Sequence, residues 1–502
     1  MSPLGKILAP LALLLCAGVA GRTTATQKLL SEYAGKEPLR SGIVGVLAVR
    51  GADTLAQMNR SIKMVPASNM KLLTTGLALL NLGADWQFRT TLAYSGTIKD
   101  GVLEGDLYIV GGGDPTTAAQ TPCADSVAVT FAKWKKILDD KGIKAIKGSV
   151  VGDPRFFGRP FADPSWQAED LGCIDGAGPS GLNFFGNSQV FTVSPGPVGK
   201  APKIELQYPD TPWMNYVNSA VTSASGTANT IYYLGTGFGP FGEFHGQFPS
   251  GRREYKYYST NFFGSYTCAY FFCNYLISFG IPVDGGYADI SPQGNIRTDL
   301  LFSDVGRRAL PSDALQPLGV TLSPQLWEIV RDTNFESNNF YAETLFNMLS
   351  AKRFGKSNRD LSDDAAMEML TTMGLRPAGA CVIRDGSGLS RKNYVSAEFF
   401  VRFLRRMHGG PVRDYFIASL PGPGQGTLKY RLANVPSEIK KRVRMKSGSM
   451  NGVLCFSGYI LPEDGNRANT IYFSMLTNNV AAPASTVGPL LEDLIVSLAG
   501  EQ

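Results

Sequence analysis

The stretch between about residues 114 and 300 differs in amino-acid composition from the chain on either side, and this difference constrains the fold most. It is rich in glycine, proline and aromatic residues, with runs such as FGPFGEFHGQF and YKYYSTNFFGSY. Around it, residues 43–59 alternate like two strands, an apolar helix pattern runs to Leu82, and helix patterns return from Leu322. Three strand-like runs, RVRMKSGSM, GVLCFSGYIL and TIYFSMLT, follow near the end. The pattern predicts helices and strands interrupted by inserted material, folded as one or two smaller domains.

The chain contains two histidines, His245 and His408, and this scarcity argues against several hydrolase classes. A zinc hydrolase needs an H-E-x-x-H or comparable cluster, and a Ser-His-Asp enzyme needs a well-placed imidazole. Both histidines directly precede glycine and neither stands in such a pattern. If the chain is a hydrolase, we therefore expect a group other than histidine to move the proton, with no metal and no cofactor.

Two glycine-rich sites resemble nucleotide-binding motifs but are incomplete. A G-x-G-x-x-G motif that starts at Gly111 would need its last glycine at position 116, where the chain has Thr116. A P-loop that ends in Gly355-Lys356-Ser357 would need its first glycine at position 350, where the chain has Ser350. The net charge of +6 comes without a long Lys/Arg block. We therefore expect no nucleic-acid partner.

The N-terminus has the pattern of an export signal. Lys6 precedes an apolar run from Ile7 to Ala20, which is too short to span a membrane and ends in small residues suited to cleavage. A buried N-terminal helix is the alternative, and Cys16 suggests lipidation, although the bulky Leu15 before it argues against that. We predict a signal peptide over residues 1–20, at most peripheral membrane contact, and a periplasmic or other extracytoplasmic location.

Cleavage of such a signal would leave an even number of cysteines in a compartment that permits disulfides. The six that would remain are Cys123, Cys173, Cys268, Cys273, Cys381 and Cys455. Their connectivity cannot be deduced from the sequence, and free buried thiols remain an alternative.

Ser68 and Lys71 stand at the start of the first apolar helix pattern, in Ser68-Asn69-Met70-Lys71. Side chains at positions i and i+3 of a helix share a face, so a neutral Lys71 could accept the Ser68 proton. The alternative is a helix-capping serine beside a surface lysine. A second S-x-x-K begins at Ser437, but it follows Val-Pro in a polar stretch and opens no apolar helix.

Two further motifs follow in order along the chain. Ser337-Asn338-Asn339 precedes a strong helix pattern, and Lys446-Ser447-Gly448-Ser449 ends a strand-like run. Alone, the first could cap a helix and the second could be an ordinary turn. The order of serine-lysine on a helix, a Ser/Asn loop, and K-[ST]-G on a strand is that of penicillin-recognising serine acyltransferases.

The chain resembles the class C low-molecular-mass penicillin-binding proteins, the D-alanyl-D-alanine carboxypeptidase/endopeptidase family. The resemblance spans nearly all of the mature chain, through PASNMKLLTT, LYIVGGGDPT, IKGSVVGDPRF, WEIVRDTNFESNNFYAETL, RDGSGLSRKN and RMKSGSMNGVLCFSGYI. It implies an α+β catalytic domain of the β-lactamase-like type, with a mainly antiparallel sheet covered by helices. This domain would be split between residues 27–87 and 300–502, with β-rich insertions, two in number, over 88–299.

The resemblance also implies roles for the three motifs. Ser68 would attack the carbonyl of the penultimate D-alanine and Lys71 would be the general base. Ser337 would relay a proton to the leaving amine, while Asn339 would orient Lys71 and bind the substrate amide. Lys446 and Ser447 would hold the terminal carboxylate and support this proton network.

Further residues would bind the substrate. Ser447 would bind the terminal carboxylate, and Gly448 would let the substrate backbone approach closely. The backbone N–H groups of Ser68 and Ser449 would form the oxyanion hole. Ser447 departs from the threonine common in the family, although the hydroxyl is kept. Trp166 and Asp170, in PSWQAEDLGC, would contact the third residue of the stem peptide, with an ordinary surface acid as the alternative for Asp170.

We therefore predict a serine DD-peptidase that acts on peptidoglycan stem peptides and is inhibited by β-lactams. The alternatives are a β-lactamase, a non-catalytic peptidoglycan-binding protein with the same fold, and a secreted adhesion module. The sequence leaves open the balance of carboxypeptidase and endopeptidase activity, the third stem residue and the oligomeric state.

Overall fold

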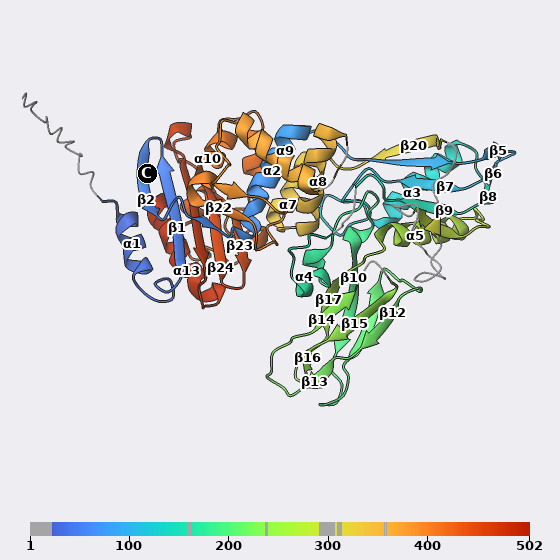
Figure 1. The fold of residues 1–502 in the computed structure, drawn as a ribbon, viewed down its shortest axis with the longest axis horizontal. Coiled ribbons are helices and arrows are strands. Elements are labelled where there is room, and N and C mark those ends of the chain that lie inside the picture. The colour runs from blue at the N-terminus through green and yellow to red at the C-terminus, as the bar shows by residue number, and fades with distance from the viewer. Residues whose placement is uncertain are drawn as a thin grey trace, which may run out of the picture.

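The computed structural model describes residues 23–157, 162–235, 239–290, 307–308, 314–355, 357 and 359–501. The predicted export signal at residues 1–20 lies outside these residues. In Figure 1 the chain forms an elongated molecule: a helix-covered sheet carries both ends of the described chain, a second sheet lies at the far side, and a smaller group of strands projects between them.

The first sheet joins the two ends of the chain. Its strand order is β2-β1-β25-β24-β23, with every neighbouring pair antiparallel. The strands are β1 (Ile43–Arg50), β2 (Asp53–Met58), β23 (Val443–Met450), β24 (Val453–Ile460) and β25 (Ile471–Asn478). β25 lies between β1 and β24, so it holds β1 and β2 to the strands that follow α12 (Ser437–Arg442).

Helices cover both faces of this sheet, which explains why β1, β24 and β25 read as continuous apolar runs. On one face, α1 (Ala25–Ala34) and α13 (Ala484–Ala499) pack over Val44, Val46 and other buried residues. On the other face, α10 (Ala397–His408) packs against Leu47 and Val49. Successive side chains of β1 therefore enter two different cores.

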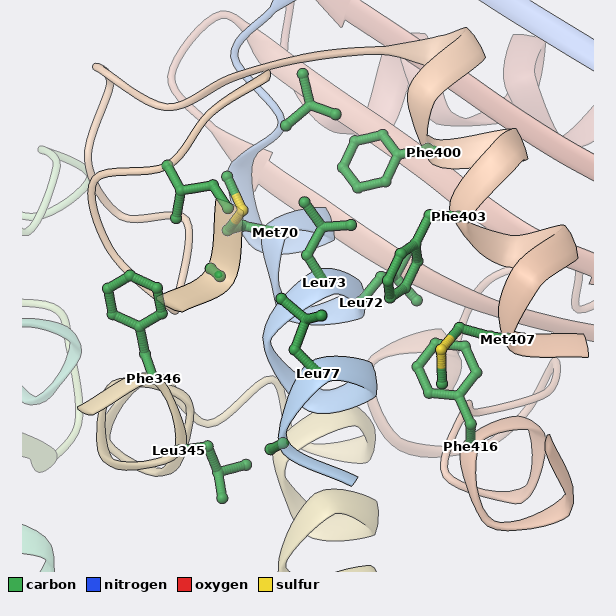
Figure 2. Close-up of a cluster of buried hydrophobic side chains, with 14 of the residues drawn as sticks. Met70, Leu72, Leu73, Leu77, Leu345, Phe346, Phe400, Phe403, Met407 and Phe416 are labelled. Carbon is green, nitrogen blue, oxygen red and sulfur yellow. The ribbon is translucent and has the colours of Figure 1, made fainter. Parts of the chain in front are cut away.

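A helical layer on the α10 side contains the helix that begins beside Ser68. This helix, α2 (Met70–Leu82), is buried over most of its length, and Figure 2 shows Leu73 and Leu77 among side chains from neighbouring helices. The other helices are α7 (Leu326–Phe335), α8 (Asn339–Phe354), α9 (Arg359–Thr372) and α11 (Arg413–Ala418). A small sheet of β3 (Lys63–Met64), β21 (Cys381–Val382) and β22 (Tyr394–Ser396) lies beside it.

The second sheet is mixed, with order β19-β18-β9-β7-β4-β20. Its strands are β4 (Arg89–Tyr94), β7 (Leu107–Val110), β9 (Val150–Asp153), β18 (Tyr287–Ile290), β19 (Arg307–Arg308) and β20 (Gln316–Leu322). Helices α3 (Val127–Asp140) and α5 (Gly264–Ser278) share its main core, in which Trp134 and Phe272 are buried. A side sheet contains β5 (Thr97–Lys99), β6 (Val102–Glu104) and β8 (Ala145–Ile146).

The projecting strands form a small β-rich unit with an aromatic core that includes Phe191, Tyr233 and Phe244. One sheet contains β10 (Ser188–Ser194), β11 (Lys203–Tyr208) and β17 (Tyr255–Thr260). The others contain β12 (Asn215–Asn218), β14 (Tyr232–Gly235) and β15 (Phe241–His245), and the pair β13 (Val221–Ser223) and β16 (Gln247–Pro249).

The predicted α+β fold with a mainly antiparallel, helix-covered sheet is confirmed. The domain boundaries at 87 and 300 stay a prediction. Strand pairing adds that β20, which follows residue 300, belongs with β4 in the mixed sheet. No helix within the described ranges is long and apolar enough to cross a membrane. The six described cysteines are all free thiols.

Candidate active site

Ser68 lies in a tight turn directly before α2. The turn is a short 3-10 helix, Ala67–Asn69, and its first residue adopts a φ of 45° although it is not glycine. Neither this helix nor α2 has a side chain that caps it by a hydrogen bond, so Ser68 is not the capping serine of the alternative interpretation. Ser337 also has a positive φ, of 56°. Such backbone conformations persist where the surrounding structure enforces them, and they cluster at functional sites.

The Lys71 amine lies at the centre of the site. The side chain is fully buried, and its Nζ donates to Ser68 Oγ over 3.0 Å, to Asn339 Oδ1 over 2.6 Å and to the Ser387 carbonyl over 2.8 Å. Burial lowers the pKa of Lys71 to about 8, against the opposing effects of the carboxylates of Asp175, Asp385 and Glu343. A lysine with that pKa is neutral in an appreciable fraction of molecules near neutral pH and can then accept the Ser68 proton.

The Ser/Asn motif stands where α8 begins. Asn338, not Ser337, caps this helix, because its side chain accepts from Tyr341 N. That leaves Ser337 Oγ to accept a hydrogen bond from Lys446 Nζ over 2.9 Å. Asn339 uses both ends of its amide: its oxygen accepts from Lys71, and its nitrogen donates to the Asp175 carbonyl over 3.0 Å. The motif thus contacts both lysines.

The third motif lies on β23, next to the Ser68 turn. Lys446 is fully buried, and burial, followed by the nearby charge of Lys71, holds its pKa well below the ordinary value. Ser447 Oγ donates to Thr427 Oγ1 over 3.1 Å. At Gly448, a Cβ would lie 2.8 Å from Ser68 N, so only glycine permits this approach of strand and turn.

Two cavities of about 340 Å³ each meet at these motifs. The first contains Ser68, Ser447, Ser449, Thr427 and Arg431 among its lining residues. The second lies on the other side of the Ser/Asn loop, with Tyr258 and Phe340 in its wall. The residues shared by both cavities are Asp175, Glu336, Ser337 and Asn339. Hydroxyl groups and the Arg431 guanidinium therefore gather on one side of Ser68, and two carboxylates stand where the cavities meet.

The two site residues predicted outside the motifs lie elsewhere. Trp166 is 6% exposed, and its Nε1 donates to Asp385 Oδ2 over 2.8 Å. Asp170 accepts from Gln167 N at the start of α4 (Ala168–Leu171), and burial raises the pKa of its carboxyl above the ordinary value. Neither residue lines the two cavities. Their contact with substrate stays a prediction.

Sequence reasoning missed several residues of the site. Asp175, Glu336, Thr427 and Arg431 line the first cavity and belong to no motif. The carbonyl of Ser387 contacts Lys71 through the backbone, where residue type gives no signal, although RDGSGLSRKN was recognised as a family stretch. His408, with its Nδ1 2.9 Å from the Tyr472 hydroxyl, packs between α10 and the first sheet and belongs to neither cavity.

Comparison with known proteins gives consistent matches. Residues 26–233 and 301–494 match the D-Ala-D-Ala carboxypeptidase 3 (S13) family. A D-alanyl-D-alanine carboxypeptidase from Actinomadura sp. is 29% identical over 462 residues, covering 88% of this chain and 78% of that protein. The D-alanyl-D-alanine carboxypeptidase DacB from Haemophilus influenzae is 24% identical over 86% of this chain and 85% of its own length. The crystal structure of penicillin binding protein 4 from Haemophilus influenzae superposes with a TM-score of 0.77 at 21% identity, covering 94% of this chain and 99% of that one.

Proposed function

The chain belongs to the D-Ala-D-Ala carboxypeptidase 3 (S13) family and is a serine DD-peptidase, and we propose that Ser68 is its nucleophile and Lys71 its general base. The observation that carries this proposal is the contact of 3.0 Å between Lys71 Nζ and Ser68 Oγ. The amine that makes this contact is buried and has a pKa lowered to about 8. A nucleophile beside a base held by further groups is the arrangement that activates a serine.

Acylation begins when neutral Lys71 takes the Ser68 proton and Ser68 Oγ attacks the carbonyl of the penultimate D-alanine. The negative charge that develops on the carbonyl oxygen is stabilised by the backbone N–H groups of Ser68 and Ser449. Gly448 supports this step, because the close packing of β23 on the Ser68 turn holds the two N–H groups in place. The C–N bond then breaks, and water later hydrolyses the ester.

Ser337 and Lys446 return the proton to the leaving amine. Ser337 Oγ accepts from Lys446 Nζ, and the charge of Lys71 is near enough to contribute to the lowered pKa of Lys446. The proton taken by Lys71 would reach the departing nitrogen through Ser337 Oγ, which borders the same cavity as Ser68. The lowered pKa of Lys446 allows this amine to share the proton with Ser337.

The substrate carboxylate binds on the basic side of Ser68. Ser447, Thr427 and Arg431 line the cavity there, and the buried Lys446 contacts Ser337 in its wall. Arg431 also pairs with Glu492 over 3.1 Å. A terminal carboxylate is the group that distinguishes a D-Ala-D-Ala end, and these side chains supply the charge and donors to bind it. β-Lactams carry a carboxylate beside a reactive carbonyl, so they acylate Ser68 in the same position.

The natural substrate is a peptidoglycan stem peptide, and the enzyme acts outside the cytoplasm. The location rests on the apolar run and small residues of the predicted export signal at residues 1–20. The intact contacts of Lys71, Asn339 and Lys446 weigh against a non-catalytic protein of the same fold.

Labelling with a fluorescent penicillin tests the assignment, with wild type compared with Ser68→Ala. We expect the wild type to form a stable covalent adduct and Ser68→Ala to form none. Ser437→Ala is a matched control, because Ser437 begins the second S-x-x-K at the surface helix α12, and it should label like wild type. An unlabelled wild type, or equal labelling of Ser68→Ala, would overturn the proposal. Rapid turnover of the adduct would identify a β-lactamase instead.

A further inference from the structure

A single peptide group links Lys71 to a buried carboxylate. The Ser387 carbonyl accepts from Lys71 Nζ over 2.8 Å. The N–H of the same peptide group, on Gly388, donates to Asp385 Oδ1 over 2.8 Å. Asp385 is fully buried in the loop between β21 and β22. The position of the carbonyl that contacts the base therefore depends on the position of the Asp385 carboxylate.

Four N–H groups surround that carboxylate. Oδ1 accepts from Gly388 N and from Asn393 Nδ2 over 2.7 Å. Oδ2 accepts from Ser390 N over 2.6 Å and from Trp166 Nε1 over 2.8 Å. Each oxygen has two donors, which is the acceptor-only pattern of a carboxylate and fixes the plane of the group.

Three of these donors belong to the loop itself, whereas Trp166 lies 219 positions away from Asp385 in the chain. Its indole is buried, and its neighbour Ser165 makes a second contact with the loop, Oγ to Oγ of Ser390 over 2.5 Å. The segment around Trp166 thus holds the loop at two points.

The same loop also packs on the turn that carries Ser68. Gly388 has a φ of 85°, and a Cβ there would lie 1.9 Å from the Ala67 carbonyl oxygen. Only glycine fits in this backbone conformation and this space. A displacement of the loop would therefore disturb both the nucleophile turn and the base.

We propose that Trp166 and Asp385 are positioning residues for Lys71. The inference rests on the proposed function of Ser68 and Lys71 and goes beyond it. The indole N–H fixes Asp385, Asp385 fixes the Ser387–Gly388 peptide group, and the carbonyl of that group fixes the amine against Ser68 Oγ. Trp166 acts on catalysis through the base.

The variant Trp166→Phe removes the N–H donor and keeps an aromatic ring in the buried site. The charged groups around Lys71 stay in place: Asp175, Glu343, Asp385 and Lys446. With one donor fewer, the negative charge of Asp385 is less neutralised, and it acts more strongly to raise the pKa of Lys71. We therefore expect both a slower acylation and a rate profile displaced to higher pH.

The test measures the acylation rate constant at saturating fluorescent penicillin, and the dissociation constant, across pH 6 to 9. Trp166→Phe should lower the rate constant roughly tenfold or more, as expected for a misplaced catalytic group. Its dissociation constant should not change. Trp134→Phe is the matched control, because Trp134 is also buried and also donates one indole hydrogen bond, to Thr321 Oγ1 over 3.0 Å in another core. It should acylate like wild type.

Two outcomes would overturn the inference. One is a Trp166→Phe enzyme with the rate constant and pH profile of wild type. The other is a weakened dissociation constant with an unchanged rate constant, which would show that the indole binds substrate. Either result with a wild type that labels at Ser68 leaves the proposed function standing, whereas a wild type that does not label removes both.

Poor folding of Trp166→Phe would not obscure the result, because the rate constant is obtained from the time course of labelling and not from its amplitude. Asp385→Asn supplies a second variant with the opposite electrostatic effect. It removes a charge that raises the pKa of Lys71, so its rate profile should move to lower pH. An Asp385→Asn profile that coincides with that of wild type would contradict the inference.

Discussion

The side-chain oxygen of Asn339 accepts a hydrogen bond from the Lys71 amine over 2.6 Å, although the two residues stand 268 positions apart in the chain. Asn339 is the first residue of α8, and Lys71 lies in the first turn of α2. A hydrogen bond to a neutral amide oxygen thus joins the first turn of α2 to the first turn of α8. The contact orients the base without adding a charge that would raise its pKa.

Asn339→Asp tests this relationship. A carboxylate in contact with the amine would favour the charged form of Lys71 and raise its pKa, so the rate profile for penicillin acylation should move to higher pH. The pH dependence of the acylation rate constant measures this. Asn338→Asp is a control on the neighbouring residue, since aspartate also caps helices well, and it should shift the profile less. Equal shifts in the two variants would contradict a specific role for Asn339.

Acylation by the wild-type enzyme should depend on the protonation of Lys71. Its pKa is lowered to about 8, and the neutral form is the base, so the rate is highest above this pH and falls as pH decreases through it. Well below the pKa, the acylation rate constant should fall roughly tenfold per pH unit. Stopped-flow measurement between pH 6 and 9 checks this. A rate constant independent of pH over that range would exclude Lys71 as the general base.

Gly448→Ala should strongly slow acylation and leave most of the fold intact. The added Cβ would lie 2.8 Å from Ser68 N and 2.9 Å from Asn69 N, so β23 must move away from the oxyanion N–H. Loss of one oxyanion donor costs about 10²- to 10³-fold in rate. Penicillin labelling and thermal unfolding measure the two effects separately.

Gly409→Ala is the matched control, because the nearest atom to its Cβ would be 3.7 Å away. Its φ of −90° suits alanine, so both labelling and stability should stay close to wild type. Full activity of Gly448→Ala would show that the strand does not need to approach the Ser68 turn this closely.

Leu77→Ala should destabilise the fold without changing the chemistry. Leu77 is 1% exposed on α2, and Figure 2 shows it among buried side chains of the helical layer. Removal of a buried leucine side chain lowers the free energy of unfolding by about 3 kcal/mol. Urea denaturation measures the loss, and the pH profile of acylation should keep its midpoint. A loss below ~1 kcal/mol would mean that the helices close around the cavity.

The sequence predicted the fold class and the three motifs, and the structure brings Ser68, Lys71, Ser337, Asn339 and Lys446 together. These residues could be found because residue type and order carry the signal. The contact of Trp166 with Asp385 could not, since it joins two segments that no local pattern relates. The parallel pairing of β7 with β9 was not foreseen either, because strands of four residues contain too little alternation to define their partners.

The position of β25 between β1 and β24 has a consequence for biosynthesis. Ser68 leaves the ribosome early, but the sheet that brings Lys446 to it closes only when residues 471–478 can insert between the two halves. A nascent chain that ends before β25 has a serine and a lysine but no assembled site. Such a chain would stay inert toward acylating agents until β25 has been synthesised, and a stop codon before β25 would yield a protein unable to bind penicillin.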